Sequence, residues 1–279
     1  MEVRRLAAFS TGNTGGNPAG VVLCETLPEQ LIMQALAATV GYSETVFAAP
    51  HDDGWRIRYF APKMELRFCG HATIALGAAL AAERGNGTFL LHLNDATITV
   101  EGECTDNMLA AALQSPPTSS EPAGEEVLAL ALDLFSYKRT DLDPRLPAAF
   151  VEAGARHLML SLASRSRLTE MHYDFEIGAE LMRSWNLATI SLLHAETPSL
   201  FHTRNPFAAG GVYEDPATGA AAAALAGYLR DLGWPHPGYI DIHQGDDMGT
   251  PCRLRAEIST TQGSSIRVSG TARYLAEAE

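Results

Sequence analysis

The 279-residue sequence contains few cysteines, and none of them stands in a metal-binding spacing. Its four cysteines are Cys24, Cys69, Cys104 and Cys252, and no two of them form a C-x-x-C pair. The nine histidines include neither an H-x-H nor an H-E-x-x-H pattern. We therefore predict a protein with no metal site, whose thiols are reduced as they are in the cytosol.

Positive charge and long apolar runs are also scarce. The 20 lysines and arginines stand against 33 aspartates and glutamates, and the net charge of −13 disfavours nucleic acid and anionic membranes as partners. No apolar run reaches the roughly 20 residues of a membrane span, and residues 1–6 (MEVRRL) do not resemble a signal peptide. A local group of backbone amides can still bind a small anion within such a field. The sequence thus predicts a cytoplasmic protein, and its charge does not exclude a small anionic metabolite as the ligand.

Nucleotide-binding motifs are missing as well. The glycine-rich segment 11–20 (TGNTGGNPAG) has neither the G-x-G-x-x-G spacing nor a Gly-Lys-Ser/Thr sequence, and a strand over residues 21–23 follows it instead of a helix. Two interpretations remain open for this segment: a tight hairpin, or a loop whose backbone approaches a ligand closely.

The most informative segment that is present precedes an alanine-rich helix. Residues 210–219 read GGVYEDPATG, and small apolar residues continue to Leu229. Asp215 is expected to cap this helix, with Pro216 in its first position. A helix that is small and apolar on every side is buried, and its polar, glycine-rich start offers backbone amides to an anion. The alternative interpretation is a well-capped core helix.

A second copy of this pattern lies in the first half of the chain. Residues 68–82 read FCGHATIALGAALAA, and aligning Ala72-Thr73 with Ala217-Thr218 sets Gly70-His71 opposite Asp215-Pro216. Strand-like segments precede both copies, at residues 55–60, 190–195 and 200–203. The repeat predicts an α+β fold of two similar domains, each a mixed, mainly antiparallel sheet wrapped around a central helix. The two helix starts would meet in a cleft between the domains, where ligand sites commonly form.

The domain boundary is predicted at a segment rich in proline and serine, residues 116–122 (PPTSSEP), which is typical of a linker. The first domain then covers residues 1–115, with its central helix beginning near Gly70. The second covers residues 116–265, with its central helix beginning at Asp215. The remaining segment, residues 266–279, is expected to return to the first domain as a strand.

Three side chains could supply acid–base chemistry. Glu44 stands at the start of an apolar strand, where it is either a solvated strand-end acid or a carboxylate in an apolar cleft with a raised pKa. Together with His71 and Asp215 it would form a cluster that shares protons, although His71 can equally be a helix-start histidine bonded to backbone. A two-thiol racemase would pair Cys69 with a second cysteine at the other helix start, which the sequence does not contain, and Cys69 alone is typical of a small buried residue.

Five motifs in this order closely resemble the PhzF-like family of phenazine biosynthesis: residues 16–21 (GNPAGV), 43–45 (SET), 68–73 (FCGHAT), 214–220 (EDPATGA) and 243–245 (HQG). The resemblance extends from Leu6 to Arg273. It implies the fold of diaminopimelate epimerase, two similar mixed sheets each wrapped around a central helix, usually as a homodimer. The founding activity of the family is the cofactor-independent isomerisation of trans-2,3-dihydro-3-hydroxyanthranilate.

The resemblance also implies roles for particular residues. Glu44 matches the general acid/base that moves a proton between substrate carbons, and His71 and Asp215 match its partners. We assign substrate binding to residues within the family motifs, namely Asn17, Gly70, Ala72, Thr73, Ala217, Thr218, Gly219, Gln244 and Gly245.

One position departs from the family pattern. After the Gln-Gly turn the family commonly reads Met-Gly-Arg-Pro-Ser, whereas residues 248–252 read MGTPC. Thr250 thus replaces an arginine that would make either an ion pair or an anion contact near the cleft. The identity of the substrate is therefore not determined by the resemblance, whereas the proton chemistry does not depend on this arginine. We predict a homodimeric, cofactor-independent isomerase of a small carboxylate-bearing metabolite. The alternatives are an amino-acid racemase or epimerase that uses Cys69, or a non-catalytic small-molecule binding protein of the same fold.

Overall fold

The computed structural model describes residues 1–106 and 108–276, which divide into two compact units. Residues close in space, rather than close in sequence, define each unit. The first unit comprises Met1–Gln114, Thr250–Arg253 and the chain from Ser269 onward; the second comprises Ser115–Gly249 and Leu254–Val268.

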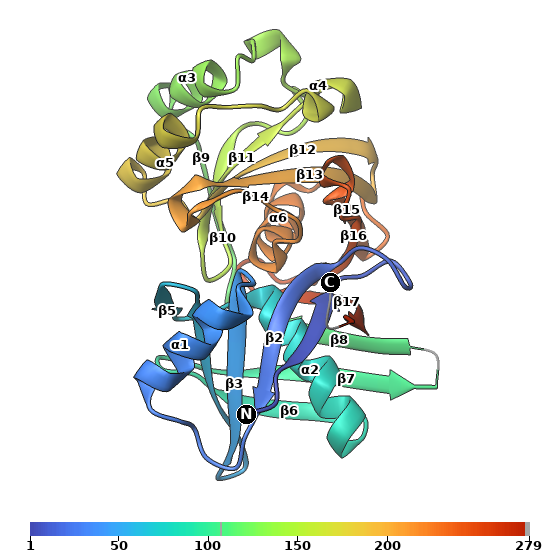
Figure 1. The fold of residues 1–279 in the computed structure, drawn as a ribbon. Coiled ribbons are helices and arrows are strands. Elements are labelled where there is room, and N and C mark those ends of the chain that lie inside the picture. The colour runs from blue at the N-terminus through green and yellow to red at the C-terminus, as the bar shows by residue number, and fades with distance from the viewer. Residues whose placement is uncertain (107, 277–279) are drawn as a thin grey trace. The chain divides into compact units, whose positions relative to one another are not determined.

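The first unit is a ring of paired strands around one helix (Figure 1). The sheet is mixed: β2 pairs in parallel with β3 and β4 in parallel with β6, whereas β1–β2, β3–β4, β4–β5, β6–β7 and β7–β8 are antiparallel. The last strand, β17, pairs with both β1 and β8 and so closes the ring. The strands are β1 (Arg4–Ala8), β2 (Asn17–Leu23), β3 (Glu44–His51), β4 (Gly54–Ala61), β5 (Met64–Leu66), β6 (Gly87–His92), β7 (Thr97–Thr105), β8 (Met108–Gln114) and β17 (Arg267–Tyr274).

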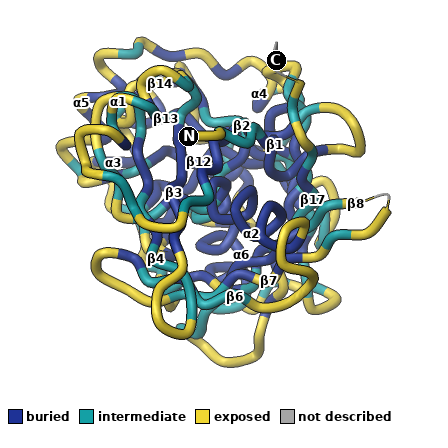
Figure 2. Tube along the Cα trace, turned by 60° about the horizontal axis from the view of Figure 1, so that its bottom comes forward, coloured by how far each residue is buried: buried dark blue, intermediate teal, exposed yellow. Residues whose placement is uncertain are grey.

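Helix α2 (Gly70–Arg84) lies inside this ring, and every residue from His71 to Ala81 is buried (Figure 2). Its small side chains allow the sheet to approach the helix backbone. A Cβ atom on Gly102 of β7 would lie 2.2 Å from the carbonyl oxygen of Gly77 in α2. The helix can therefore occupy the centre only because both positions lack a side chain.

Helix α1 (Gln30–Val40) covers the outer face of the ring. It buries Met33 and Ala37 against Val22, Phe47 and Phe60. The helix ends at Gly41, whose φ of 76° is in the left-handed region that glycine adopts readily. This turn sends the chain directly into β3.

The second unit repeats the plan with a different outer layer. Its strands pair in the order β9–β10–β11–β12–β13–β15, with β14 also against β13. Helices α3 and α5 pack on one face of this sheet over an apolar core, and α6 lies on the other face (Figure 1). The strands are β9 (Ser119–Pro122), β10 (Ala149–Glu152), β11 (Arg156–Ser161), β12 (Thr189–Thr197), β13 (Leu200–Phe207), β14 (Val212–Asp215), β15 (Tyr239–Gln244) and β16 (Cys252–Glu257). The helices are α3 (Glu125–Leu134), α4 (Arg165–Thr169), α5 (Phe175–Ser184) and α6 (Gly219–Leu232), with 3₁₀ turns η1 (Arg139–Asp141), η2 (Ala208–Gly210) and η3 (Asp246–Met248).

Helix α6 is buried along most of its length, as its composition predicts (Figure 2). A Cβ atom on Gly227 would lie 2.6 Å from the Cβ atom of Thr118. As in α2, a glycine at the point of closest approach lets another segment pack directly on the helix.

The predicted cap and first residue of this helix are each wrong by three residues. Asp215 is the last residue of β14, where it pairs with Asn205, and Thr218 occupies the cap position of α6. Pairing with β13 thus overrides the helix-start signal of the Asp-Pro sequence. Asp215 is therefore a strand-end residue rather than a helix cap.

Two other predicted boundaries also differ from the structure. Residues 119–122, predicted as part of a linker, form β9 and pair with β10. The glycine-rich segment ends earlier than expected, because β2 already begins at Asn17 and pairs with β1 as an antiparallel hairpin joined by residues 9–16. Pairing partners distant in sequence again decide where these strands begin.

Candidate functional site

Glu44 is buried although it stands at the end of a strand. It is the first residue of β3, beside Ala19 of the parallel strand β2, and is only 6% exposed. The apolar residues that follow it along β3 are buried as well. The solvated strand-end interpretation is therefore wrong, and Glu44 is a carboxylate in an apolar setting.

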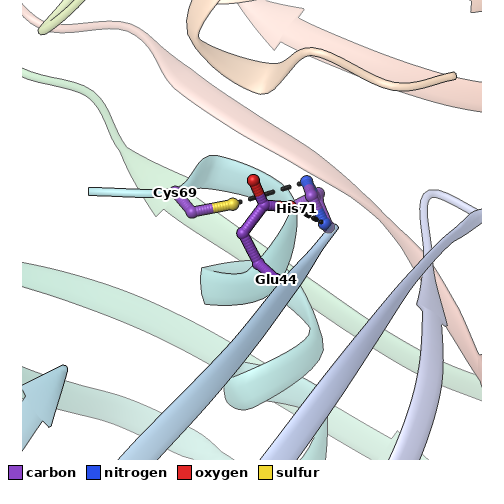
Figure 3. Close-up of side chains that lie close together, drawn as sticks. All are labelled: Glu44, Cys69 and His71. Atoms are coloured by element: carbon purple, nitrogen blue, oxygen red, sulfur yellow. Dashed lines mark hydrogen bonds and ion pairs between the residues drawn. The ribbon is translucent and has the colours of Figure 1, made fainter. Parts of the chain in front are cut away.

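His71 lies beside this carboxylate at the start of α2. Its Nε2 atom is 3.1 Å from Oε2 of Glu44, and its Nδ1 atom is 3.4 Å from Sγ of Cys69 (Figure 3). The Ser43 hydroxyl lies 3.5 Å from the same Nε2 atom. The contact with Glu44 is a close ion pair rather than a well-aligned hydrogen bond, since Oε2 makes no regular hydrogen bond within the described chain.

The charge of Glu44 reflects two opposing influences. Burial, the larger single influence, acts to raise the pKa of the Glu44 carboxyl, whereas the charge of His71 and contacts with His71 and Ser43 lower it. The lowering influences together prevail, so the pKa lies below its usual value. The raised pKa expected from burial alone is thus reversed by the imidazolium, and Glu44 is ionised at neutral pH.

The same contacts hold the proton on His71. Burial acts to lower the pKa of His71, but Cys69 and Glu44 raise it well above its usual value. Burial and the neighbouring Glu44 raise the pKa of the Cys69 thiol itself, which keeps this thiol neutral. The carboxylate of Glu44 is therefore the group that stabilises the imidazolium.

Thr73 and Tyr59 fix the backbone at the start of α2. The hydroxyl of Thr73 donates to the carbonyl oxygen of Cys69 at 2.7 Å and lies 2.7 Å from the hydroxyl of Tyr59. No side chain caps the first turn of α2 in the described structure. The amides of Gly70 and Ala72 are thus held at the helix start, where the N–H of Ala72 also contacts the Cys69 sulfur; a helix start favours an anion.

A second group of predicted site residues comes together in the second unit. Oδ2 of Asp215 accepts a hydrogen bond from the hydroxyl of Thr218 at 2.7 Å. The amide of Gln244 donates to the backbone oxygen of Asp215 at 2.7 Å, and its Oε1 atom accepts from the backbone N–H of Thr218 at 3.2 Å. Gln244 thus positions the start of α6, where the buried Ala217 precedes the helix and the buried Gly219 is its first residue. Gly245 follows in the left-handed region, with φ of 78°.

The strand that carries Asp215 is held by a buried ion pair that sequence reasoning missed. Arg204 and Glu214 are 8% and 7% exposed, and their side chains meet in a two-point contact, Nε to Oε1 at 3.0 Å and Nη2 to Oε2 at 2.5 Å. Arg204 also donates to the backbone oxygen of Thr169 at 3.0 Å. No sequence pattern singles out this arginine, because its partner lies on the neighbouring strand.

Asn17 and Thr250, the remaining residues of interest, lie in the first unit. Asn17 is 2% exposed in β2. The carbonyl oxygen of Pro251, the residue after Thr250, accepts the N–H of Gly16 at 3.1 Å. The position that departs from the family pattern is therefore adjacent to the glycine-rich segment.

Within the described residues, two sets of side chains have the composition and spacing of metal ligands. One is Glu44, Cys69 and His71; the other is His202, His243 and Asp246. The first set already forms the ion pair described above. Within the described chain, no helix is both long and apolar enough to span a membrane.

Comparison with known proteins places these residues in a family context. A family model described as "Phenazine biosynthesis-like protein" (PhzC-PhzF) matches residues 6–278. The chain is 32% identical to the trans-2,3-dihydro-3-hydroxyanthranilate isomerase of Pseudomonas aeruginosa, covering 97% of this chain and 95% of that protein. It is also 32% identical to the uncharacterized isomerase mll1393 of Mesorhizobium japonicum, covering 96% and 95%.

Solved structures confirm the expected fold class. A predicted epimerase, PA4716 of Pseudomonas aeruginosa, superimposes with a TM-score of 0.86 at 25% identity, covering 98% of this chain and 96% of that one. A PhzF-family protein of Bacillus anthracis gives a TM-score of 0.85 at 22% identity, covering 99% and 98%. A probable proline racemase of Agrobacterium radiobacter shares the fold at a TM-score of 0.68 and 9% identity, covering 98% and 90%.

Proposed function

The chain belongs to the phenazine biosynthesis-like (PhzC-PhzF) family, and from this premise we propose that it is an isomerase in which Glu44 moves a proton between carbons of a small carboxylate-bearing metabolite. The isomerase class agrees with the names of its relatives. The observation that carries the proposed chemistry is the buried pair of Glu44 and His71, with 3.1 Å between Oε2 and Nε2.

In the proposed reaction Glu44 acts first as a base. Its lowered pKa keeps the carboxylate ionised before substrate binds, so it can accept a proton from a substrate carbon. The electron pair left behind is delocalised into the adjoining unsaturated system, and Glu44 returns the proton to another carbon. A substrate carboxylate brought nearby adds a like charge, which raises the pKa of Glu44 towards the value that proton transfer requires.

We assign the substrate carboxylate to the backbone amides at the helix starts. The uncapped first turn of α2, at Gly70 and Ala72, and the segment Ala217–Gly219 before and at the start of α6 supply such donors. Asp215 and His71 are assigned as assisting groups, and Asn17, Gln244 and Gly245 as residues that shape the site. The expectation that both groups act on one substrate stays a prediction.

The substrate class follows from the proposed chemistry. The Pseudomonas aeruginosa relative acts on trans-2,3-dihydro-3-hydroxyanthranilate, and we propose a carboxylate with an adjoining double bond for this chain too. Thr250 carries no charge, so a second anionic group of the substrate is not expected at that position.

Proton–deuterium exchange in heavy water tests the role of Glu44. Wild-type protein is incubated with a panel of small unsaturated carboxylates, including dihydro-hydroxyanthranilate, and deuterium incorporation is followed by NMR. Exchange and turnover should fall by about 10²–10⁴-fold in Glu44→Gln, the usual contribution of a general acid–base group. Glu65→Gln is the matched control, because Glu65 is bound to Arg58 outside the site. Full turnover in Glu44→Gln would contradict the assignment.

A second candidate function rests on the thiol of Cys69, whose sulfur is 3.4 Å from Nδ1 of His71. An amino-acid racemase would use this thiol as its base. The raised pKa of Cys69 disfavours the thiolate that such a mechanism needs. Cys69→Ser should therefore retain most of the exchange activity, whereas an inactive Cys69→Ser that still folds would favour the racemase.

We further propose a homodimer in the cytosol that needs no cofactor. Four free cysteines in the described chain support a reducing compartment. The exposed Leu31 and Ile32 on α1 offer apolar surface for a second copy. Light scattering during size-exclusion chromatography measures the mass directly, and a mass of one chain would contradict the dimer.

A further inference from the structure

Three histidines form a row across neighbouring strands of the second unit. His194 of β12 is the register partner of His202 in β13, and His202 is the partner of His243 in β15. Cross-strand partners project from the same face of a sheet. The rings of His202 and His243 are accordingly close, with centroids 5.4 Å apart and planes at 88°.

One nitrogen in this row is a buried acceptor without a hydrogen bond. Nε2 of His202 lies 2.5 Å from Oε2 of Glu196, so this nitrogen carries the proton that it donates to the carboxylate. In a neutral imidazole the other nitrogen, Nδ1, then has a lone pair. Nδ1 of His202 is buried and has no hydrogen-bond partner in the described structure. Buried polar atoms are rarely left in this state, so a ligand for this lone pair is expected.

Two further side chains with potential ligand atoms lie close to His202. His202, His243 and Asp246 each offer one potential ligand atom, and these three atoms all lie within 4.8 Å of one another. Gly245, with φ of 78°, turns the chain between β15 and η3 and so brings Asp246 next to the strand. In a tetrahedral zinc site the bond lengths place ligand atoms about 3.3 Å apart. Small side-chain rotations would bring these atoms to that spacing.

We propose that His202, His243 and Asp246 bind a divalent transition-metal ion of the zinc type, with Glu196 orienting His202. Two imidazoles and one carboxylate are a common ligand set for such ions. A carboxylate that accepts the second ring N–H of a metal-binding histidine is the usual outer-shell partner. Three protein ligands leave a fourth position for water.

The position of the site suggests its role. His243 and Asp246 flank the Gln244-Gly245 turn, and the side chain of Gln244 bonds to Asp215 and Thr218. Successive residues of a strand face opposite sides of the sheet, so the metal lies on the face opposite Gln244. It would therefore hold the turn in place without contacting the groups around Asp215.

Metal binding is tested on full-length protein freed of metal with a chelator. Isothermal titration with Zn²⁺ should give one equivalent bound, and Co²⁺ should give a visible spectrum of nitrogen and oxygen ligation without a sulfur charge-transfer band. His202→Ala and Asp246→Asn should weaken binding by at least tenfold. Glu196→Gln should still bind one equivalent of Zn²⁺, but its affinity should be about 10–100-fold lower, as is usual when an outer-shell partner is changed.

Two control variants distinguish this site from others. His172→Ala changes an exposed histidine of the same unit, and Cys69→Ser changes the alternative ligand set; both should bind Zn²⁺ as wild type does. Circular dichroism checks that each variant folds. If His202→Ala does not fold, Asp246→Asn still tests the proposal, because Asp246 lies in a surface turn. Absence of Zn²⁺ binding, loss of binding in Cys69→Ser, or unchanged binding in Asp246→Asn would overturn the proposal.

Discussion

At the residue scale, the charge of Glu44 depends on one neighbour. Burial alone would leave a carboxyl such as Glu44 protonated near neutral pH, but the imidazolium of His71, 3.1 Å away, reverses the direction of the pKa shift. The pair is thus an ionised carboxylate in contact with an imidazolium.

Replacing His71 with asparagine should raise the pKa of Glu44. The neutral amide does not supply the positive charge of the imidazolium, so the effect of burial is opposed mainly by the contact with Ser43. In wild type the carboxylate stays ionised below the ordinary glutamate pKa of about 4.3; in His71→Asn it should become protonated at a higher pH. NMR titration of ¹³C-labelled glutamate carboxyls, assigned with Glu44→Gln, measures this pKa, and the acidic limb of the pH–rate profile should move in the same direction.

The matched control for this titration is His51→Asn, because His51 is half-exposed and pairs with Asp52 on the surface. It should leave the pKa of Glu44 unchanged. A Glu44 pKa that stays the same or falls in His71→Asn would show that the imidazolium does not control the carboxylate.

At the element scale, close approach between helix and sheet is possible because particular positions lack a side chain. Gly102→Ala should destabilise the protein by about 1–3 kcal/mol, because its Cβ atom would meet the backbone oxygen of Gly77. The control is Gly87, its exposed cross-strand partner in β6, where an added Cβ atom would meet no other atom within 4 Å. Gly87→Ala should change the free energy of unfolding by less than about 0.5 kcal/mol. Urea denaturation compares the two, and equal effects would contradict the close packing.

The buried ion pair that holds β14 predicts a larger effect. Arg204→Met would leave the carboxylate of Glu214 buried without its partner, at a cost of about 3–5 kcal/mol in unfolding free energy. The double variant Arg204→Met/Glu214→Leu should recover much of this loss, because no buried charge remains. Arg139→Met, in an exposed pair with Glu125, is the control and should cost less than about 1 kcal/mol. Thermal and urea unfolding measure all three, and a small effect of Arg204→Met would show that water reaches Glu214.

At the scale of the whole molecule, the last strand completes the first unit. β17 pairs with β1, with Leu6 opposite Tyr274, and the backbone N–H of Ser10 donates to the carbonyl oxygen of Thr271. The ring around α2 therefore contains strands from both ends of the sequence.

Removing β17 should unfold the first unit. A chain ending at residue 265 leaves β1 paired only with β2 and β8 paired only with β7, so that one edge of each strand is open and α2 is exposed at the opening. Limited proteolysis should then cut within residues 1–114, where the full chain resists. A chain ending at Leu275, which retains the bond from its N–H to Arg5, is the control and should resist as well. Resistance of the shorter chain would show that the first unit folds without its closing strand.

The sequence by itself was sufficient for the family, the fold class and the principal candidates for the site. Small apolar residues all round two helices predict that both are buried, and their repeat predicts two similar units. The motifs around Glu44 and His71 predict acid–base chemistry, and both residues are buried and in contact. The predictions of buried helices, fold class and family are confirmed, because burial of a helix and the identity of a short motif are encoded by neighbours along the chain. The acid–base role of Glu44 and His71 stays a prediction.

Only the tertiary structure decided the features that depend on partners far apart in sequence. Because β14 pairs with β13, Asp215 is the last residue of a strand and α6 begins only at Gly219. Contact with His71 lowers a pKa that burial alone would raise. The grouping of His202 with His243, 41 positions away in the sequence, arises only from the register of β13 on β15. Ion pairing and metal coordination act only over a few ångströms. Distances this short between side chains are set by the packing of strands rather than by the order of the strands in the chain.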